Sequence, residues 1–323
     1  MRLFWKEVGL AIVMGLLVPG IVLGIAAYFI ETEILEPRET QPAETSAYTE
    51  PELQIPVLSD GVVRDMELTD YLTGVVLAEM PVSFEAEAQK AQAVVARTYA
   101  LRACGGESKH ETAAVCTESG CCQGYMAPET YLAKGGLQES VDKIHSAVDA
   151  TAGYVLTYEG ELIEATYFSC SGGSTEDAVA VWGTDVPYLR ATSSPGEENA
   201  AHYTDTVNFT FDEFTDALNL EPAGDPGTWL EGVSYTAGGG VDTMTLCGKT
   251  FKGTQMRSLL GLRSTAFTLA VGGSTITVTT KGYGHRVGMS QYGADAMAMA
   301  GSTYPEILAH YYQGTTLTAW QEN

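Results

Sequence analysis

The sequence predicts an α+β protein with one membrane-spanning helix at its N-terminus, and three observations support this fold class. The chain has 323 residues, of which 45% are hydrophobic, which is enough for one large or two modest domains. Its 35 glycines indicate many turns and strands rather than a helical bundle. Helical and strand patterns do not alternate regularly along the chain, so a parallel βαβ fold is not expected.

Residues 8–30 form an uncharged, strongly apolar run. A helix of about 20 such residues crosses the hydrocarbon core of a bilayer, so this run predicts a transmembrane anchor. Arg2 and Lys6 precede it and glutamates follow it, which places residues 1–7 in the cytoplasm and the rest outside the cell membrane. A cleaved signal peptide is the alternative, because small residues occur at 24–27. The run is long for a signal peptide, so we favour an uncleaved anchor.

Residues 31–59 contain four prolines, seven glutamates and few large apolar side chains. Such a segment cannot bury a core, and it predicts an acidic, Pro-rich linker. The folded part of the chain is then expected at residues 60–318. The formal net charge of −24 disfavours binding to nucleic acid or to anionic lipid surfaces.

The first elements expected in the folded part are a strand and two helices. Residues 62–68 partly alternate between apolar and polar side chains, as a strand does. Thr69 can cap a short helix that carries Glu79 and stops at Pro81. Ser83 can cap a longer helix that ends at a Cys-Gly-Gly sequence. Its apolar stripe has near-helical spacing and consists of Phe84, Ala88, Ala91, Val95 and Leu101.

The later elements are predicted from alternation, helical periodicity and turn residues. Residues 104–125 form a cysteine-rich loop, and residues 208–260 a smaller inserted or neighbouring unit. The expected helices are 137–150, 211–218, 254–260, 293–300 and 304–312. The expected strands are 153–158, 162–168, 266–271 and 274–280.

Glu79 is the candidate catalytic acid. It lies near the C-terminal end of its predicted helix, where the negative end of the helix dipole disfavours a carboxylate. Leu77, Met80 and Phe84 are sequence neighbours that can desolvate it. Both effects raise a carboxyl pKa and favour a proton donor near neutral pH. The alternative is a solvated acid on a helix surface, which describes most glutamates.

Long motifs occur in order along the chain at Gly74–Pro81, Glu87–Ala100, Ser171–Asp177, Gly288–Ala294 and Ile307–Thr315. From about residue 60 to 318 they resemble stage II sporulation protein D. The resemblance implies a lytic transglycosylase that cleaves peptidoglycan strands during spore engulfment, with Glu79 as its catalytic residue and no nucleotide cofactor. It also implies a cell-wall amidase that first removes the stem peptides, and a membrane partner in the engulfment machinery.

The chemistry of the implied reaction needs one carboxyl group. An acid protonates the leaving glycosidic oxygen, and hydrolysis usually needs a second carboxylate. In a lytic transglycosylase the sugar's own 6-hydroxyl replaces water, the same glutamate then acts as the base, and the product has a 1,6-anhydro end. Glu176, Asp177 and Asp185 are the weaker candidates for a second carboxylate.

Other polar residues are candidates for contacts with the glycan. Lys90 and Arg97 lie on one helix face and match the family pattern, although a solvated or salt-bridged face explains them equally well. Glycine turns let a backbone approach a sugar, and neighbouring side chains can hydrogen-bond it, while ordinary turn chemistry is the alternative. These loop candidates are Ser171, Gly172, Gly173, His285, Ser290, Gln291 and Tyr292.

Two further features of these loops are left open by the sequence. The segment Gly284-His285-Arg286 departs from the Gly-His-Gly that the family more often shows, which puts the local backbone in doubt. Trp182 can either stack on a sugar ring or pack in the core.

His110, Cys116 and Cys122 occur in one loop with the spacing H-x5-C-x5-C, and Cys121 is adjacent. Imidazole and thiolate are good zinc ligands, and three protein ligands would leave a fourth position open. Some members of the resembled family carry zinc ligands at this spacing. Disulfide bonds are the alternative in an exported chain, among Cys104, Cys116, Cys121, Cys122, Cys170 and Cys247.

Two other functions fit parts of the sequence. Amidase enhancers share the first motif, so the chain can instead be a non-catalytic glycan-binding protein that stimulates a cell-wall amidase. A zinc peptidase or amidase built on the cysteine loop ranks last, because the chain lacks H-E-x-x-H.

Overall fold

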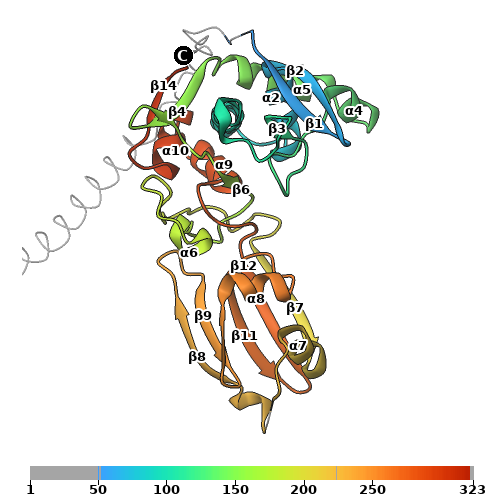
Figure 1. The fold of residues 1–323 in the computed structure, drawn as a ribbon, viewed down its shortest axis with the longest axis vertical. Coiled ribbons are helices and arrows are strands. Elements are labelled where there is room, and N and C mark those ends of the chain that lie inside the picture. The colour runs from blue at the N-terminus through green and yellow to red at the C-terminus, as the bar shows by residue number, and fades with distance from the viewer. Residues whose placement is uncertain (1–49, 51, 223, 321–323) are drawn as a thin grey trace, which may run out of the picture. The chain divides into compact units, whose positions relative to one another are not determined.

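A computed structural model describes residues 50, 52–222 and 224–320, and it is a mixed α+β structure (Figure 1). The anchor predicted at residues 8–30 and the cytoplasmic segment predicted at residues 1–7 lie outside the described residues. Among the residues that are described, no helix is long and apolar enough to cross a bilayer.

The folded part begins with a small sheet that includes residues assigned above to the linker. Strand β1 (Gln54–Ser59) pairs antiparallel with β2 (Val62–Glu67) and parallel with β3 (Val115–Cys116). Ile55 and Val57 point to one face of β1 and are fully buried. Two buried side chains on one strand face are enough to attach this segment to the core, although its prolines and glutamates resemble a linker.

The two helices predicted before and after Pro81 are present as α2 (Leu68–Glu79) and α3 (Ala86–Arg102). The expected caps are wrong, because the N-cap positions are Glu67 and Glu85 and neither makes a side-chain cap hydrogen bond. Each helix is instead held by burial, since a helix with an apolar surface gains most of its stability from tertiary packing.

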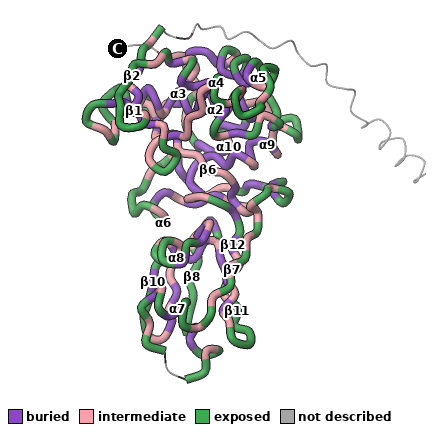
Figure 2. Tube along the Cα trace, turned by 90° about the vertical axis from the view of Figure 1, so that its right-hand side faces the viewer, coloured by how far each residue is buried: buried purple, intermediate pink, exposed green. Residues whose placement is uncertain are grey.

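Helix α3 is the centre of the larger hydrophobic core (Figure 2). It packs against α2, α5 (Gln138–Asp149), α9 (Gln291–Met299), α10 (Tyr304–Tyr311) and strand β4 (Tyr154–Tyr158). Its many alanines let these neighbours approach closely, and the predicted apolar stripe is buried throughout. After Arg102 the chain continues as a π-helical turn, Ala103–Glu107, so the Cys-Gly-Gly sequence does not end the helix at once.

The remaining elements of this core come from both ends of the sequence. Strand β4 lies between β5 (Glu161–Leu162) and β14 (Thr316–Ala319), while β6 (Tyr167–Phe168) pairs in parallel with β13 (Met289–Ser290). The strand predicted at 162–168 is therefore two short strands in different sheets. Two short helices complete the set, α4 (Pro128–Ala133) and α6 (Ala178–Trp182).

Residues 204–281 build a second hydrophobic core. This segment extends beyond the unit predicted at 208–260 at both ends. The strands predicted at 266–271 and 274–280 belong to it, as β11 (Ala266–Gly272) and β12 (Thr275–Lys281), because β12 also pairs with β7 (Thr204–Thr210). The second sheet has the order β10-β9-β8, from Lys249–Lys252, Val241–Leu246 and Leu230–Tyr235. The helices are α7 (Phe211–Leu218), α8 (Gly253–Leu259) and the short η2 (Pro226–Thr228).

Arg97, a candidate glycan contact, is a core residue with no exposed surface. Its guanidinium donates to both carboxylate oxygens of Glu50, at 2.5–3.0 Å, and to the carbonyls of Val148 and Tyr154. Lys90, the other candidate on α3, forms an ion pair with Glu87 at 2.6 Å and is part-exposed. The structure thus gives both residues protein partners, and neither lines the cavity described below.

Replacing Arg97 by Met is expected to destabilise the protein far more than replacing Lys90 by Met. Loss of one partner from a buried ion pair leaves an uncompensated charge and costs about 3–5 kcal/mol, whereas a part-exposed pair contributes about 0–1 kcal/mol. Denaturant unfolding of both variants measures the difference. Equal unfolding free energies for the two variants would contradict the structural role of Arg97.

Candidate active site

The carboxyl group of Glu79 lies at the last position of α2, where Met80 turns into an extended conformation ahead of Pro81. Its Oε1 accepts a hydrogen bond from the backbone N–H of Gly124 at 2.6 Å. Its Oε2 lies 3.5 Å from the side-chain amide nitrogen of Gln291. A Cβ atom at position 124 would come within 2.9 Å of Oε1, so any larger residue there would displace the carboxyl group. Three distant segments therefore meet at one carboxyl group.

Burial raises the pKa of Glu79 above its ordinary value of 4.5, and this is the largest effect on the group. Hydrogen bonds from Gly124, Gln291 and Tyr167 act in the opposite direction, because they favour the ionised form. The net result is a weaker acid than a solvated glutamate, as the sequence predicts. The neighbours expected to desolvate it, Leu77, Met80 and Phe84, are all buried.

Glu79 lies where two hollows meet. The larger has a volume of about 600 Å³ and the smaller about 380 Å³. Both are lined by Glu79, Ser169 and Gln291. Among the described residues that line the larger cavity, the carboxylates are Glu79 and Glu164. A chain of linked units can therefore occupy space on both sides of the Glu79 carboxyl group.

Some of the predicted contacts reach these hollows. Gln291 lines both, His285 lines the larger cavity, and Tyr292 lines the smaller one. The ring of Tyr292 packs edge-on against Phe84, with centroids 5.0 Å apart. Ser290 does not line either hollow, because its hydroxyl caps α9 by accepting the N–H of Gly293 at 3.2 Å.

The loop at Ser171, Gly172 and Gly173 is held by a buried carboxylate, Glu197, that no sequence pattern singles out. Glu197 Oε2 accepts hydrogen bonds from the Ser171 N–H and hydroxyl at 2.7 and 2.8 Å, and from the Gly172 N–H at 3.1 Å. Its other oxygen accepts from Ser194. This loop therefore has a supporting role, and it does not line the cavity. Glu197 lies in an irregular segment, so no periodicity marked it.

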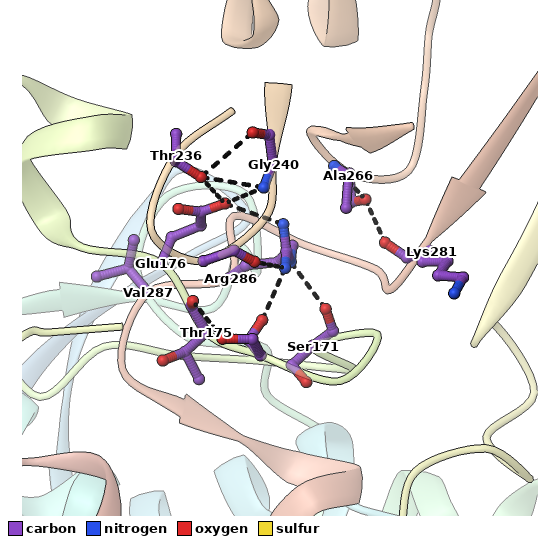
Figure 3. Close-up of polar contacts among 12 residues, drawn as sticks. Ser171, Thr175, Glu176, Thr236, Gly240, Ala266, Lys281, Arg286 and Val287 are labelled. Carbon is purple, nitrogen blue, oxygen red and sulfur yellow. Dashed lines mark hydrogen bonds and ion pairs between the residues drawn. The ribbon is translucent and has the colours of Figure 1, made fainter. Parts of the chain in front are cut away.

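Arg286 connects the loop at 171–176 with the second core (Figure 3). Its guanidinium donates to the carbonyls of Ser171, Ser174 and Gly238, each at 2.7 Å, and to Glu176 at 3.0 Å. Arg286 is 2% exposed and has a φ of 66°, in the left-handed region that glycine favours. The departure from Gly-His-Gly thus keeps the backbone conformation of a glycine and adds a buried cation.

The three candidates for a second carboxylate have other partners. Glu176 accepts from Arg286, from Thr236 at 2.8 Å and from the N–H of Gly240 at 2.9 Å. Asp177 accepts the N–H of Ala191, and Asp185 pairs with an arginine. None of the three lines the larger cavity.

Four side chains of the cysteine loop lie close enough to share a metal ion. The ligand atoms of His110, Cys116, Cys121 and Cys122 all lie within 4.8 Å of one another. His110 Nε2 is 3.4 Å from Cys122 Sγ and 3.7 Å from Cys121 Sγ, and the two sulfurs are 4.0 Å apart. Tetrahedral bonds of about 2.0–2.3 Å imply ligand separations of roughly 3.5–3.8 Å, so the set fits a metal.

The structure adds Cys121 to the three candidate ligands expected from the sequence, so a metal ion bound here would have four protein ligands and no open position. All six cysteines have free thiols. Cys121 and Cys122 also line the larger cavity, and the Gly124 N–H that contacts Glu79 follows two residues after Cys122.

Replacing Glu79 by Gln is expected to stabilise the protein at neutral pH but not in acid. A carboxyl group with a raised folded-state pKa contributes full stability below its ordinary value of 4.5 and loses it as the pH rises through the folded pKa. Glutamine carries no charge to desolvate. Thermal melts of both proteins from pH 4 to 8 should diverge as the pH increases. A difference that is constant over this range would argue against the raised pKa.

Comparison with known proteins points to the same family as the sequence motifs do. Residues 59–158 match the family model described as Stage II sporulation protein. The chain is 39% identical to stage II sporulation protein D of Bacillus amyloliquefaciens over 287 residues, which covers 87% of this chain and 83% of that protein. It is 38% identical to the Bacillus subtilis (strain 168) protein of that name over 287 residues, covering 86% and 83%.

A second kind of relative is the amidase enhancer of Bacillus subtilis (strain 168), which is 30% identical over 302 residues. That match covers 77% of this chain and 40% of the enhancer. The two sporulation proteins share a higher sequence identity with this chain than the enhancer does, and the match covers a larger share of their length. The chain therefore belongs to the stage II sporulation protein D family.

Proposed function

We propose that this protein is a lytic transglycosylase that cleaves peptidoglycan glycan strands, with Glu79 as general acid and then as general base. One observation carries the proposal: a desolvated carboxyl group with a raised pKa lies where two hollows meet. A glycan strand that runs through both hollows brings one glycosidic bond to this group.

In the first step, protonated Glu79 gives its proton to the bridging oxygen of the strand, and the bond from that oxygen to C1 breaks. Positive charge develops on the sugar ring while Glu79 becomes a carboxylate. The Gly124 N–H and the Gln291 amide are positioned to donate to that carboxylate. They therefore stabilise the charge that the step creates.

In the second step, the Glu79 carboxylate takes the proton of the sugar's own 6-hydroxyl, and that oxygen bonds to C1. The products are a 1,6-anhydro end and a free hydroxyl end, and no water is consumed. Because Glu79 regains its proton, one carboxyl group completes the cycle. The engagement of Glu176, Asp177 and Asp185 with other partners supports this single-acid route.

The setting of the reaction is part of the proposal. Residues 8–30 anchor the chain in the cell membrane, with its N-terminus in the cytoplasm and residues 60–318 outside. The substrate is then the peptide-free glycan strands present during spore engulfment. A cell-wall amidase first removes the stem peptides, and the protein acts on the strands together with a membrane partner. The names of the sporulation relatives support the link to sporulation within this setting.

The identity to an amidase enhancer favours one alternative, in which the chain binds glycan without cutting it and stimulates an amidase. Full-length protein incubated with peptide-free strands distinguishes the two. The enzyme yields 1,6-anhydro ends by mass spectrometry, and Glu79→Gln lowers the rate about 10²-fold or more. The rate falls as the pH rises through the raised pKa of Glu79, because the acid form is required. Equal product from Glu79→Gln, or no cleavage with stimulated amidase activity, would exclude the mechanism.

We further propose that His110, Cys116, Cys121 and Cys122 bind zinc. Four protein ligands are typical of a structural zinc site, which would hold the loop that carries Gly124 against Glu79. The chemistry of the metal would be limited to this support, because thiolate and imidazole fill the usual coordination positions.

The zinc proposal predicts about one zinc per chain in the purified protein. Cys121→Ser should weaken zinc retention and lower the melting temperature, because it removes a ligand. Cys247→Ser is the matched control, since Cys247 does not belong to the cluster. This variant should retain the zinc content and the melting temperature of the parent protein. Metal analysis and a thiol count decide the matter. A metal-free protein with fewer than six free thiols would support disulfides instead.

A further inference from the structure

Two aromatic side chains at the larger cavity are unusually exposed. Trp182 is 42% exposed and Tyr283 is 39% exposed, and both line the cavity that contains Glu79. Folded proteins normally cover large aromatic surfaces, so exposed rings at a cavity commonly mark a ligand contact. The alternative left open by the sequence, that Trp182 packs in the core, does not agree with its exposure.

The Trp182 ring is held in place by His285. Their ring centroids are 5.3 Å apart, and His285 also packs edge-on against Phe168 at 5.6 Å. His285 Nδ1 accepts the N–H of Val287 at 3.1 Å, and the ring makes a second hydrogen bond to the Tyr167 backbone. Burial lowers the pKa of His285 to about 4, so its ring is neutral at physiological pH. Because both polar atoms are occupied, His285 supports Trp182 rather than binding a sugar hydroxyl.

Tyr283 is fixed by different partners. Its backbone N–H and carbonyl pair with Cys170 at 2.7 and 3.1 Å, which holds the residue beside the loop at 171–173. The Arg263 guanidinium lies 5.0 Å from the centre of its ring, and the His202 ring meets it edge-on at 5.3 Å. Arg263 in turn forms an ion pair with Asp205 at 2.8 Å. The ring is therefore held by its neighbours while much of it stays open to solvent.

We propose that Trp182 and Tyr283 form an aromatic platform on which sugar rings of the glycan strand stack, on the large-cavity side of Glu79. The inference rests on the proposed function and names two residues that would bind its substrate. Pyranose rings present C–H groups on their faces and hydroxyls at their edges. An aromatic ring covers the apolar face, while the carbonyls and polar side chains of the cavity remain for the edges.

The platform also assigns a task to the second core. Tyr283 lies two residues after the end of β12. Its neighbours come from the second core, because Asp205 lies in β7 and Arg263 lies between α8 and β11. Trp182 belongs to the other group of elements, at the end of α6, where Gly183 adopts a φ of 80°. One strand of sugars that contacts both rings would therefore engage both parts of the protein.

The test is binding of chitooligosaccharides and of peptide-free peptidoglycan strands to full-length protein carrying Glu79→Gln, which prevents turnover. In this background Trp182→Ala should weaken binding about ten-fold, because an aromatic stacking contact is worth about one factor of ten. Trp182→Phe should retain most of the affinity. Val179→Ala is the matched control, because Val179 is a 45% exposed residue of the same helix that does not line the cavity, and it should bind as the parent does.

Tryptophan fluorescence gives a second readout that a purely structural role would not change. Saccharide binding should alter the emission of the parent protein, and Trp182→Phe should abolish most of that change. Among the other described tryptophans, Trp229 is buried in the second core, and Trp320 packs against the larger core and lines neither hollow. Parent-like affinity for Trp182→Ala together with an unchanged fluorescence response in Trp182→Phe would overturn the platform. Failure of the proposed function is a separate result, seen as full cleavage by Glu79→Gln or as no saccharide binding by the parent.

Discussion

The buried ion pair between Arg286 and Glu176 is the interaction on which the arrangement of the site depends. The guanidinium reaches the loop at 171–174 and the turn at Gly238, and Glu176 completes the cluster through Thr236 and Gly240. Both side chains are almost completely buried, at 2% and 1% exposure. Removing either partner would leave a buried charge unpaired, which is far more costly than the net contribution of the intact pair.

This cluster matters for chemistry because His285 immediately precedes Arg286 in the chain. The backbone conformation that buries the guanidinium also directs the imidazole toward Trp182 and the cavity. Glycines at 238 and 240 are part of the same constraint, since a Cβ atom at either would collide with Thr175 or Glu176. One wall of the cavity is thus set by packing around a charge that lies outside the cavity.

Another part of the cavity lining is set by the environment of Glu79. Desolvation makes the carboxyl group a weaker acid, while the Gly124 N–H and the Gln291 amide limit that effect. This balance suits the proposed role, in which one group both releases and recovers a proton within a cycle. The neighbouring His and Cys cluster lies in the loop that supplies Gly124, so this loop positions both the hydrogen-bond donor and the candidate metal ligands.

Some features of this protein were predictable because they depend on local sequence. Helical spacing identified α2, α3 and α7, and the position of Glu79 at the end of α2 follows from the proline two residues later. Strands β8, β9 and β10 were missed, because β8 is exposed along its length and gives no alternating burial signal. Segment β1 was assigned to the linker, because two buried residues are a weak signal beside prolines and glutamates.

The family, the mixed α+β class, the candidate acid and three of the four metal-ligand candidates were predictable before the fold was known, because each depends on residue type and short-range spacing. Which polar residues reach the cavity was settled by the folded arrangement. It placed Arg97 in the core, used Ser171 and Gly172 to bind Glu197, and brought Trp182, Tyr283 and Cys121 to the cavity wall. Partners 25 to 212 residues apart in the chain determine burial and hydrogen bonding here, and local patterns do not encode such distances.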